Sequence, residues 1–203
     1  MPSAEAPASG KRPSGRERIL EAAYDLFSRS GVRAIGVDTI TLHADVAKMT
    51  LYRNFSSKHE LAMAFLDLRE ERWSKEWLQA EVRARSDIAS GQLLAIFDVF
   101  EEWFAREDFE GCAFVTSLLE FDDREDPVRQ ACISHLVNIR AFIAELAEQA
   151  GIADPPRFAT QWHILMKGAI VSAHEGEPDA ALAAKEVASL LLERHGLELA
   201  ARL

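Results

Sequence analysis

The sequence predicts an all-α protein of about nine helices, with a three-helix N-terminal domain and a larger helical body after it. Apolar residues recur every three to four positions along most of the 203-residue chain. No segment alternates apolar and polar residues over the length of a strand. Turn-forming clusters (DFEG, DDRED, GIADP and HEGEP) separate the periodic segments of the second half. These observations favour a chain built from helices alone.

The first three predicted helices are short. One covers 16–30 and is ended by Gly31, because a glycine readily takes the backbone conformation that stops a helix. The next two cover 38–44 and 47–55, and Asp38 is the expected N-cap of the first of them. This part of the chain is therefore predicted to be a compact three-helix domain.

A much longer helix is predicted to follow, from Ser56 or Ser57 towards Arg85. Glu60 stands three residues after Ser57 and completes a capping box. A helix of this length is suited to connecting two domains. The remaining helices are predicted over 87–106, 112–121, 127–150, 156–173 and 178–195.

The segment 36–61, GVDTITLHADVAKMTLYRNFSSKHEL, carries the most specific pattern in the chain. Its apolar residues can gather as a small core: Val37, Ile40, Ala44, Val46, Leu51 and Phe55. The residues left outside are mostly hydroxyl, amide and cationic: Thr39, Lys48, Met49, Thr50, Tyr52, Arg53, Asn54 and Lys58. A short helix with such a side has the shape that a DNA major groove admits, so the segment is interpreted as a helix-turn-helix.

The charge distribution agrees with a DNA-binding head. The whole chain has 23 basic and 33 acidic residues, which gives −10. Between residues 11 and 58, nine Lys or Arg stand against five acids, a local charge of 9 − 5 = +4, so the remainder carries −14. Only a basic head would then meet the phosphate backbone, and binding should depend on salt.

Composition narrows the class further. The chain is 48% hydrophobic and 28% charged, as expected of a globular protein. It contains neither an apolar run of membrane-spanning length nor the apolar block of a signal peptide, so we expect a cytoplasmic protein that does not enter a membrane. Residues 1–14 are interpreted as a flexible basic arm. Two cysteines do not make a disulfide framework or a metal cluster, and no metal or cofactor is expected.

The chain resembles the tetracycline-repressor (TetR) family of transcription regulators. The resemblance rests on ILEAAYDLFSRSGVRAIGVDTI and on VAKMTLYRNFSSKHEL, which is similar to the family signature Val-Ser-x-x-Thr-Leu-Tyr-x-His-Phe-x-x-Lys-x-x-Leu. Ala47 stands for the signature Ser and Asn54 for the His; Asp45 stands where the family usually has a turn glycine, and Thr41 where it usually has Ala. An Asp tolerates a left-handed backbone better than most residues, so we expect the turn to be intact.

The resemblance implies roles for individual residues. Lys48, Met49, Thr50 and Arg53 would face base edges or nearby phosphates, and Arg53 is the best candidate for a bidentate contact to guanine. The residues expected on the DNA backbone are Arg16, Thr39, Tyr52, Asn54 and Lys58, together with Lys11 and Arg12 of the arm. The alternative is that these are ordinary surface residues of a helical bundle.

The resemblance also implies three functional regions: the arm over 1–14, a DNA-binding domain over 15–61, and a regulatory domain over 62–203. A recognition helix this short reads few base pairs, so a homodimer on an inverted-repeat operator is expected, and repression is the default outcome. The last two helices are the expected interface, through apolar residues such as Trp162, Leu165, Met166, Ala169, Ile170, Ala173, Leu182, Val187, Leu190 and Leu191. The alternative is that these residues complete the core of one protomer.

The middle of the chain is expected to hold a small apolar or amphipathic effector, because aromatic residues gather there among few polar groups. The candidate lining residues are Trp73, Trp77, Phe100, Trp103, Phe104, Phe114, Ser117, Phe121, His135, Asn138, Trp162 and Met166. The alternative for any one aromatic is plain core. The long helix after Ser57 is the expected lever between effector and DNA.

Two further possibilities stay open. Cys112 follows Gly111 at the start of a predicted helix, where the helix dipole favours the thiolate, so Cys112 could sense oxidants; a small buried hydrophobe is the alternative. The body could also be an enzyme using Glu120, His135 or His163, or the protein could be an architectural DNA binder without a ligand. No phosphate-binding glycine loop, metal-spaced His/Cys set or serine-elbow motif supports an enzyme.

Overall fold

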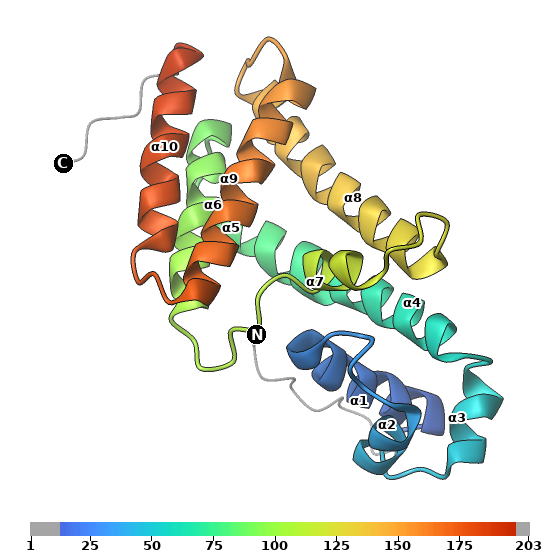
Figure 1. Cartoon of the computed structure of the whole chain (residues 1–203). Helices are drawn as coiled ribbons and strands as arrows, with labels where there is room; N and C mark the ends of the chain where they lie inside the picture. The colour runs from blue at the N-terminus through green and yellow to red at the C-terminus, as the bar shows by residue number, and fades with distance from the viewer. Residues whose placement is uncertain (1–12, 198–203) are drawn as a thin grey trace. The chain divides into compact units, whose positions relative to one another are not determined.

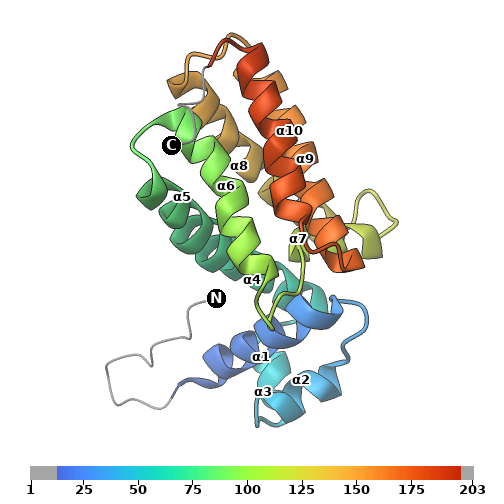
Figure 2. The ribbon, with the colours of Figure 1, turned by 90° about the vertical axis from the view of Figure 1, so that its left-hand side faces the viewer.

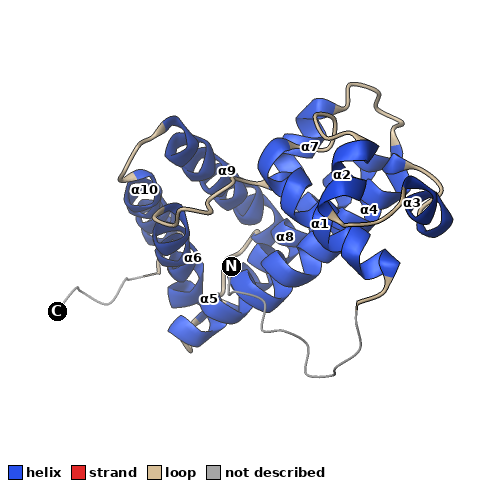
Figure 3. Ribbon diagram, turned by 90° about the horizontal axis from the view of Figure 1, so that it is seen from below, coloured by secondary structure: helices blue, strands red, loops and turns tan. Residues whose placement is uncertain are grey.

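The computed structural model describes residues 13–197, and over this part of the chain all regular structure is helical (Figures 1 and 3). The helices α4, η1 and α5 follow one another without a break, so the described residues form nine continuous helices, as predicted. The bounds are α1 Gly15–Ser30, α2 Val37–His43, α3 Lys48–Asn54, α4 Lys58–Arg69, η1 Glu70–Gln79, α5 Ala80–Arg85, α6 Ala89–Phe104, α7 Ala113–Glu120, α8 Pro127–Gln149, α9 Pro155–Glu175 and α10 Ala180–Arg194. η1 is a π-helical stretch within the long helix.

The chain divides into two compact units. The described part of unit 1 comprises residues 13–73 and 112–135, and that of unit 2 comprises 74–111 and 136–197. The predicted basic arm, with Lys11 and Arg12, lies outside the described residues except for residues 13 and 14.

Unit 1 is organised around α1, which packs against α2, α3, α4 and α7. A capping box starts α1: the Ser14 hydroxyl accepts from the Glu17 N–H, and the Glu17 carboxylate accepts from the Ser14 N–H. Phe65 of α4 meets two rings of α1 edge-on, Tyr24 at 5.9 Å and Phe27 at 5.5 Å between centroids. These contacts hold the short helices of the head against the first part of the long helix.

Arg69 strengthens the same contact from within. Its side chain is buried, and its guanidinium donates to the Tyr24 hydroxyl at 3.2 Å and to the Ser28 hydroxyl at 3.3 Å. One turn further along the long helix, Arg72 forms a bidentate ion pair with Glu21 of α1. The long helix is therefore joined to α1 over three successive turns.

Unit 2 is built mainly from α6, α9 and α10, which lie side by side in Figures 1 and 2. α10 packs against both α6 and α9, and the ammonium of Lys185 on α10 pairs with Asp98 on α6. Arg83 of α5 lies 5.4 Å from the ring centre of Phe142 on α8 and pairs with Glu145 of that helix. The core of unit 2 is rich in aromatic side chains.

Two predicted helix starts need correction. The N-cap of α2 is Gly36 and not Asp38, which lies in the first turn and binds Lys48 of α3 through its carboxylate. The Ser57 hydroxyl does accept from the Glu60 N–H, but the Glu60 carboxylate accepts from the N–H and hydroxyl of Ser56 and so reaches one residue beyond the predicted capping box. Among the helices of residues 13–197, none has the length and apolar character needed to cross a membrane.

Candidate nucleic-acid interface

The turn between α2 and α3 is closed by backbone hydrogen bonds. The Asp45 N–H donates to the Leu42 carbonyl at 3.2 Å, and the Val46 N–H donates to the Thr41 carbonyl at 3.0 Å. Asp45 takes φ +51°, and among the non-glycine residues between 13 and 197 it alone has a positive φ. This confirms the expectation that Asp45 adopts the left-handed backbone of the family's usual turn glycine.

Arg18 of α1 fixes this turn and was not foreseen as part of the site. Its guanidinium donates to the Asp45 carbonyl at 2.9 Å and lies 3.5 Å from the Asp45 carboxylate. The negative charge that Asp45 introduces near the expected DNA surface therefore faces a cation of the same protein. The partners are 27 residues apart, so no local sequence signal pairs them.

A small core orients α2 and α3. Ile40, Ala44, Leu51 and Phe55 are buried, as predicted, whereas Val37 and Val46 are only half-buried. Leu51 and Phe55 lie one helical turn apart, so the opposite side of α3 must face outward.

The outward side of α3 carries four of the predicted DNA-binding residues: Lys48, Met49, Tyr52 and Arg53 are all exposed. Met49 is 71% exposed and Tyr52 is 47% exposed, so both side chains are accessible to a partner. Arg53 makes no hydrogen bond or ion pair with the other residues of the described range 13–197, so its five donors are available to a partner. An unpredicted neighbour is Leu42 of α2, 84% exposed.

The other predicted residues of this surface are held by the protein itself to different degrees. Thr39 is exposed, and Thr50 is half-buried. Asn54 donates from its side-chain amide to the Thr50 carbonyl at 2.8 Å, which leaves one of its two N–H donors and the amide oxygen. The exposed Arg16 of α1 places its guanidinium 4.9 Å from the ring centre of Phe55.

The two lysines have partners in the DNA-free protein. Lys48 donates to the Asp38 carboxylate at 2.8 Å, and this hydrogen bond, with the charge of Asp38, raises the pKa of Lys48. Lys58 donates to the Arg33 carbonyl at 3.3 Å, and burial lowers the pKa of its ammonium despite the charge of Glu120. The Lys48 pair is exposed to water and gains little stability from its contact, so exchange for a phosphate costs little.

The structure divides the candidate effector-lining residues between the two units. Unit 1 contains Trp73, Phe114, Ser117, Phe121 and His135, all buried. Unit 2 contains Trp77, Phe100, Trp103, Phe104, Asn138, Trp162 and Met166; among these Asn138 is exposed and Trp77 and Phe104 are half-buried. Five of the twelve residues therefore lie in unit 1 and seven in unit 2.

Most of the aromatic rings of unit 2 pack directly on one another. Trp103 lies 5.6 Å from Phe100, 5.6 Å from Phe104 and 4.9 Å from Phe109, measured between ring centroids. Contacts at these distances are those of a close-packed core. They favour the plain-core interpretation for this group.

Polar atoms without partners lie elsewhere in the body. The Trp162 ring N–H and His163 Nδ1 in unit 2, and the Ser117 hydroxyl in unit 1, are buried and have no hydrogen-bond partner among the described residues. Burial, together with the positive charges of Lys167 and Arg140, lowers the pKa of His163 to about 3, so this ring is neutral at physiological pH.

His135 has strong partners in unit 1. Its ring stacks on Phe114 at 5.0 Å, and its Nδ1 lies 2.8 Å from the Glu70 carboxylate. Its other nitrogen lies 3.4 Å from Asp67. These contacts give His135 a structural role between α7, α8 and the long helix.

Both cysteines of the chain are free thiols. Cys112 is half-buried and is the N-cap residue of α7, as expected from its position after Gly111. Cys132 is buried, and burial raises the pKa of its thiol to about 12. Within residues 13–197, no three His, Cys, Asp or Glu side chains gather in a way that could hold a metal ion.

The buried side of α3, the ordered turn and the exposed cationic side together define a helix-turn-helix DNA-binding protein. Comparison with protein families identifies which family of DNA-binding proteins the chain belongs to. Residues 19–65 match the family model described as "Bacterial regulatory proteins, tetR family", and residues 89–187 match "Tetracyclin repressor-like, C-terminal domain". The chain belongs to the TetR family of transcriptional regulators and is a DNA-binding regulator.

Individual relatives agree with this assignment. A solved TetR-family transcriptional regulator from Streptomyces coelicolor superposes with a TM-score of 0.80 at 28% identity, over 90% of this chain and 96% of that chain. The HTH-type transcriptional regulator QacR of Staphylococcus aureus is 25% identical over 72 residues, 36% of this chain and 38% of QacR. The HTH-type transcriptional activator FasR of Mycolicibacterium smegmatis is 44% identical over 55 residues, 27% of this chain and 25% of FasR. The chain thus matches well under half of the length of these two curated relatives.

Proposed function

We propose that this protein is a dimeric repressor that binds an inverted-repeat operator through α3 and is released from it by a small apolar or amphipathic effector. In this proposal residues 15–61 form the DNA-binding domain and residues 62–203 the regulatory domain. TetR regulators bind DNA and small-molecule effectors and act as dimers. The observation that carries the proposal is the exposed side of α3, where Lys48, Met49, Tyr52 and Arg53 point away from a buried core.

The first test is selection of bound genomic fragments by the purified protein at two salt concentrations. We expect recovery of one inverted repeat, because a symmetric dimer presents two recognition helices. Binding that is salt-sensitive but shares no sequence would support the architectural alternative. The genes beside the recovered sites, and their transcription with and without the protein, decide between repression and the activation that the name of FasR describes.

Arg53 tests whether α3 reads bases. A bidentate contact to guanine contributes roughly 1–3 kcal/mol per half-site. In a dimer, which has two half-sites, Arg53→Ala should therefore weaken operator binding by twice this free energy, and it should weaken binding to random DNA much less. Arg53→Lys is the matched control, because it keeps the charge but loses the planar fork. Lys58→Ala should weaken operator and random DNA alike. Equal losses on both DNAs for Arg53→Ala would remove Arg53 from base readout.

For the dimer, the structure changes which residues of α9 we propose. The predicted residues Trp162, Met166, Ala169 and Ile170 are buried within the protomer, because they face the rest of unit 2. On α9 we propose Ile164 and Val171 in their place; on α10 we keep the predicted Leu182, Val187 and Leu190, and all five residues are 41–64% exposed.

These residues make an apolar stripe. Ile164, Gly168 and Val171 follow at four- and three-residue spacing on α9, and a side chain at Gly168 would meet nothing within 4 Å. Helix α10 packs beside α9 and adds Val187 and Leu190, three residues apart. Small residues at the centre of such a stripe permit close approach of a second helix pair, which supports a four-helix interface between two protomers.

The interface is tested by placing a charge in it. We expect Leu190→Asp to be monomeric in analytical ultracentrifugation at concentrations where the natural protein is a dimer. Leu119→Asp is the matched control, because Leu119 is a leucine of α7 that is 74% exposed. A dimer that survives Leu190→Asp would place the interface elsewhere.

For the effector, we propose a site in the body that uses the unpartnered polar atoms found there. A neutral His163 and the Trp162 N–H, both buried among apolar groups, suit a ligand that is mainly apolar and carries a hydrogen-bonding group. Thermal stabilisation by a panel of small hydrophobic compounds, with Trp162→Phe as the variant that removes only the N–H donor, tests it. A compound that stabilises the protein and releases the operator supports a sensor; a scaffold would respond to none.

A further inference from the structure

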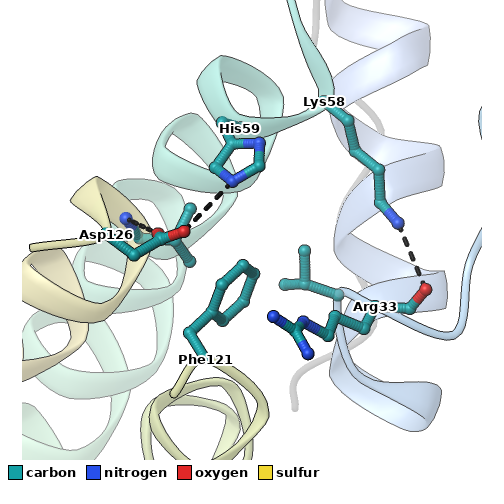
Figure 4. A pocket seen from close by; sticks show the side chains of 7 residues that line it. Arg33, Lys58, His59, Phe121 and Asp126 are labelled. Atoms are coloured by element: carbon teal, nitrogen blue, oxygen red, sulfur yellow. Dashed lines mark hydrogen bonds and ion pairs between the residues drawn. The ribbon is translucent and has the colours of Figure 1, made fainter. Parts of the chain in front are cut away.

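A cavity of about 350 Å³ lies within unit 1, where three segments of the chain meet (Figure 4). The loop after α1 contributes Arg33, the first turn of α4 contributes Lys58 and His59, and the segment that joins α7 to α8 contributes Phe121 and Asp126. Two valines complete an apolar wall beside the Phe121 ring. The cavity therefore combines cationic groups with an aromatic surface.

The two cations have capacity for a further partner. The Arg33 guanidinium lies 5.0 Å from the centre of the Phe121 ring and forms no ion pair within the described range 13–197. The Lys58 ammonium makes one hydrogen bond, at 3.3 Å to the Arg33 carbonyl, although it has three donors. Lys58 is half-buried, and this burial lowers the pKa of its ammonium. An anion placed between the two cations would satisfy both.

The two acids near the cavity are already engaged. One Asp126 oxygen accepts from the Val128 N–H at 2.8 Å, and the other lies 3.3 Å from His59 Nε2. One Glu120 oxygen accepts from the Val32 N–H at 2.8 Å and from the Arg33 N–H at 3.2 Å. These carboxylates are held by backbone donors and by His59, so neither forms an ion pair with Arg33 or Lys58.

We propose that this cavity binds a small organic anion. Its carboxylate or phosphate group accepts hydrogen bonds from Arg33 and Lys58, and its apolar part packs on the Phe121 ring. Phe121 was also among the residues predicted to line the effector site, but this cavity contains neither Trp162 nor His163, on which the proposed effector site rests.

The anion would also regulate DNA binding, a consequence that rests on the proposed function. Lys58 is the residue proposed to contact the operator backbone, and a lysine held by an anion in the cavity is withdrawn from a DNA phosphate. The anion and the operator therefore compete for the same ammonium. The same chemistry could be supplied by a free small molecule or by the DNA phosphate itself, and the experiment separates the two.

The first arm uses the full-length protein without DNA. Benzoate and inorganic phosphate are the anionic probes, and benzamide is the neutral match for benzoate; binding is followed by saturation-transfer NMR and by the amide shifts of Lys58 and His59. We expect benzoate to bind more tightly than benzamide, and Arg33→Gln to weaken its binding about tenfold. Arg29→Gln is the matched control, because Arg29 is an exposed arginine of α1 that does not line the cavity.

The result decides the proposal in either direction. Failure of both anions to bind, equal binding of benzoate and benzamide, or unchanged binding in Arg33→Gln would overturn it. Thermal melts of the two variants show whether each remains folded before binding is compared.

The second arm measures operator affinity by fluorescence anisotropy. Saturating benzoate should weaken operator binding by the natural protein and leave that of Arg33→Gln unchanged. If Arg33→Gln binds DNA more weakly without any anion, and no small anion binds the natural protein, the cavity holds a DNA phosphate and the proposal fails. If no operator exists, the proposed function fails, and the first arm still decides whether the anion site is real.

Discussion

Gly31 and Glu120 form a contact between the end of α1 and the end of α7 that can be tested quantitatively. Gly31 has φ +77° and ψ 168°, a region of backbone conformation open almost only to glycine. A Cβ atom on Gly31 would lie 2.8 Å from the Glu120 carboxyl carbon and closer still to one of its oxygens. Gly31→Ala therefore strains the backbone, and we expect it also to displace the Glu120 carboxylate from the two N–H groups that its other oxygen binds.

The magnitudes follow from these two effects. The backbone strain costs roughly 1–3 kcal/mol. Loss of the charged hydrogen bonds to Val32 and Arg33 costs roughly 1.5–3 kcal/mol. Gly31→Ala should therefore lower the free energy of unfolding by roughly 2.5–6 kcal/mol, and Glu120→Ala by roughly 1.5–3 kcal/mol. The double variant should be no less stable than Gly31→Ala, because the same hydrogen bonds cannot be lost twice.

Urea unfolding followed by circular dichroism of the two single variants and the double variant measures this cycle. We expect an interaction free energy equal to the cost of Glu120→Ala, well above the error of about 0.5 kcal/mol for independent sites. Additive effects would refute the reasoning, because they would mean that Gly31→Ala leaves Glu120 in place.

Three further predictions concern single residues. The pKa of His163 is about 3 in the folded protein, below the ordinary 6.5. Below pH 6.5 this ring therefore takes up a proton in the unfolded chain but stays neutral in the folded protein, which lowers stability. The natural protein should therefore lose about 2 kcal/mol of unfolding free energy between pH 7 and pH 5 that His163→Gln does not lose. Urea unfolding at the two pH values measures this, and an equal loss in the natural protein and in His163→Gln would contradict it. Asp45 has φ +51°, so Asp45→Ala should be about 1 kcal/mol less stable than Asp45→Gly, and the natural protein should lie between the two variants. The reverse order of stability would exclude a left-handed backbone at this position. Burial raises the pKa of Cys132 to about 12, so iodoacetamide should label Cys112 first; Cys112→Ser should react far more slowly than Cys132→Ser, as mass spectrometry would show.

The helices could be predicted because their signals are local. Apolar spacing and turn formers gave all nine helices in order, and the structure confirms them over the described residues. The predicted start of α2 was wrong because only Asp38 was considered as its N-cap, although Gly36, two positions earlier, also suits an N-cap. The choice depends on α3, whose Lys48 binds the Asp38 carboxylate, and this partner is ten residues away.

The exposed side of α3, which we propose to face DNA, could be predicted from the sequence for a related reason. Once Leu51 and Phe55 are assigned to the core, helical geometry turns Tyr52 and Arg53 outward. Contacts between segments that are distant in the sequence could not be predicted in this way. The Arg18 contact to Asp45 and the Lys58 contact to the Arg33 carbonyl depend on how the segments pack, which no periodicity records.

In α6 and α9, the periodicity of apolar residues no longer tells what each side of the helix contacts. Helix α9 is apolar on more than one side, so spacing alone cannot tell which side faces its own protomer. The sequence interpretation chose the larger residues, Trp162 and Met166, for the interface, whereas the structure buries these and exposes Ile164 and Val171. The aromatic residues of α6 raise the same difficulty, since an inward direction is shared by core residues and ligand-lining residues.

Helices α1 to α3 are joined to the rest of unit 1 through α4 and through the segment around α7, and both sets of contacts limit how the proposed effector signal can reach the proposed DNA-binding surface. Phe65, Arg69 and Arg72 join α1 to the long helix over three turns, while Glu120 of α7 binds the loop that follows α1. A shift of the long helix alone would strain the Glu120 contact, and a shift of α7 alone would strain the contacts of Arg69. An effector that favours one orientation of the head must therefore move the long helix and α7 together or break one of these contacts. Glu120→Ala loosens the α7 side, where the contact between Arg33 and the Phe121 ring remains, so it should weaken the proposed coupling between effector and operator binding even where neither affinity alone changes.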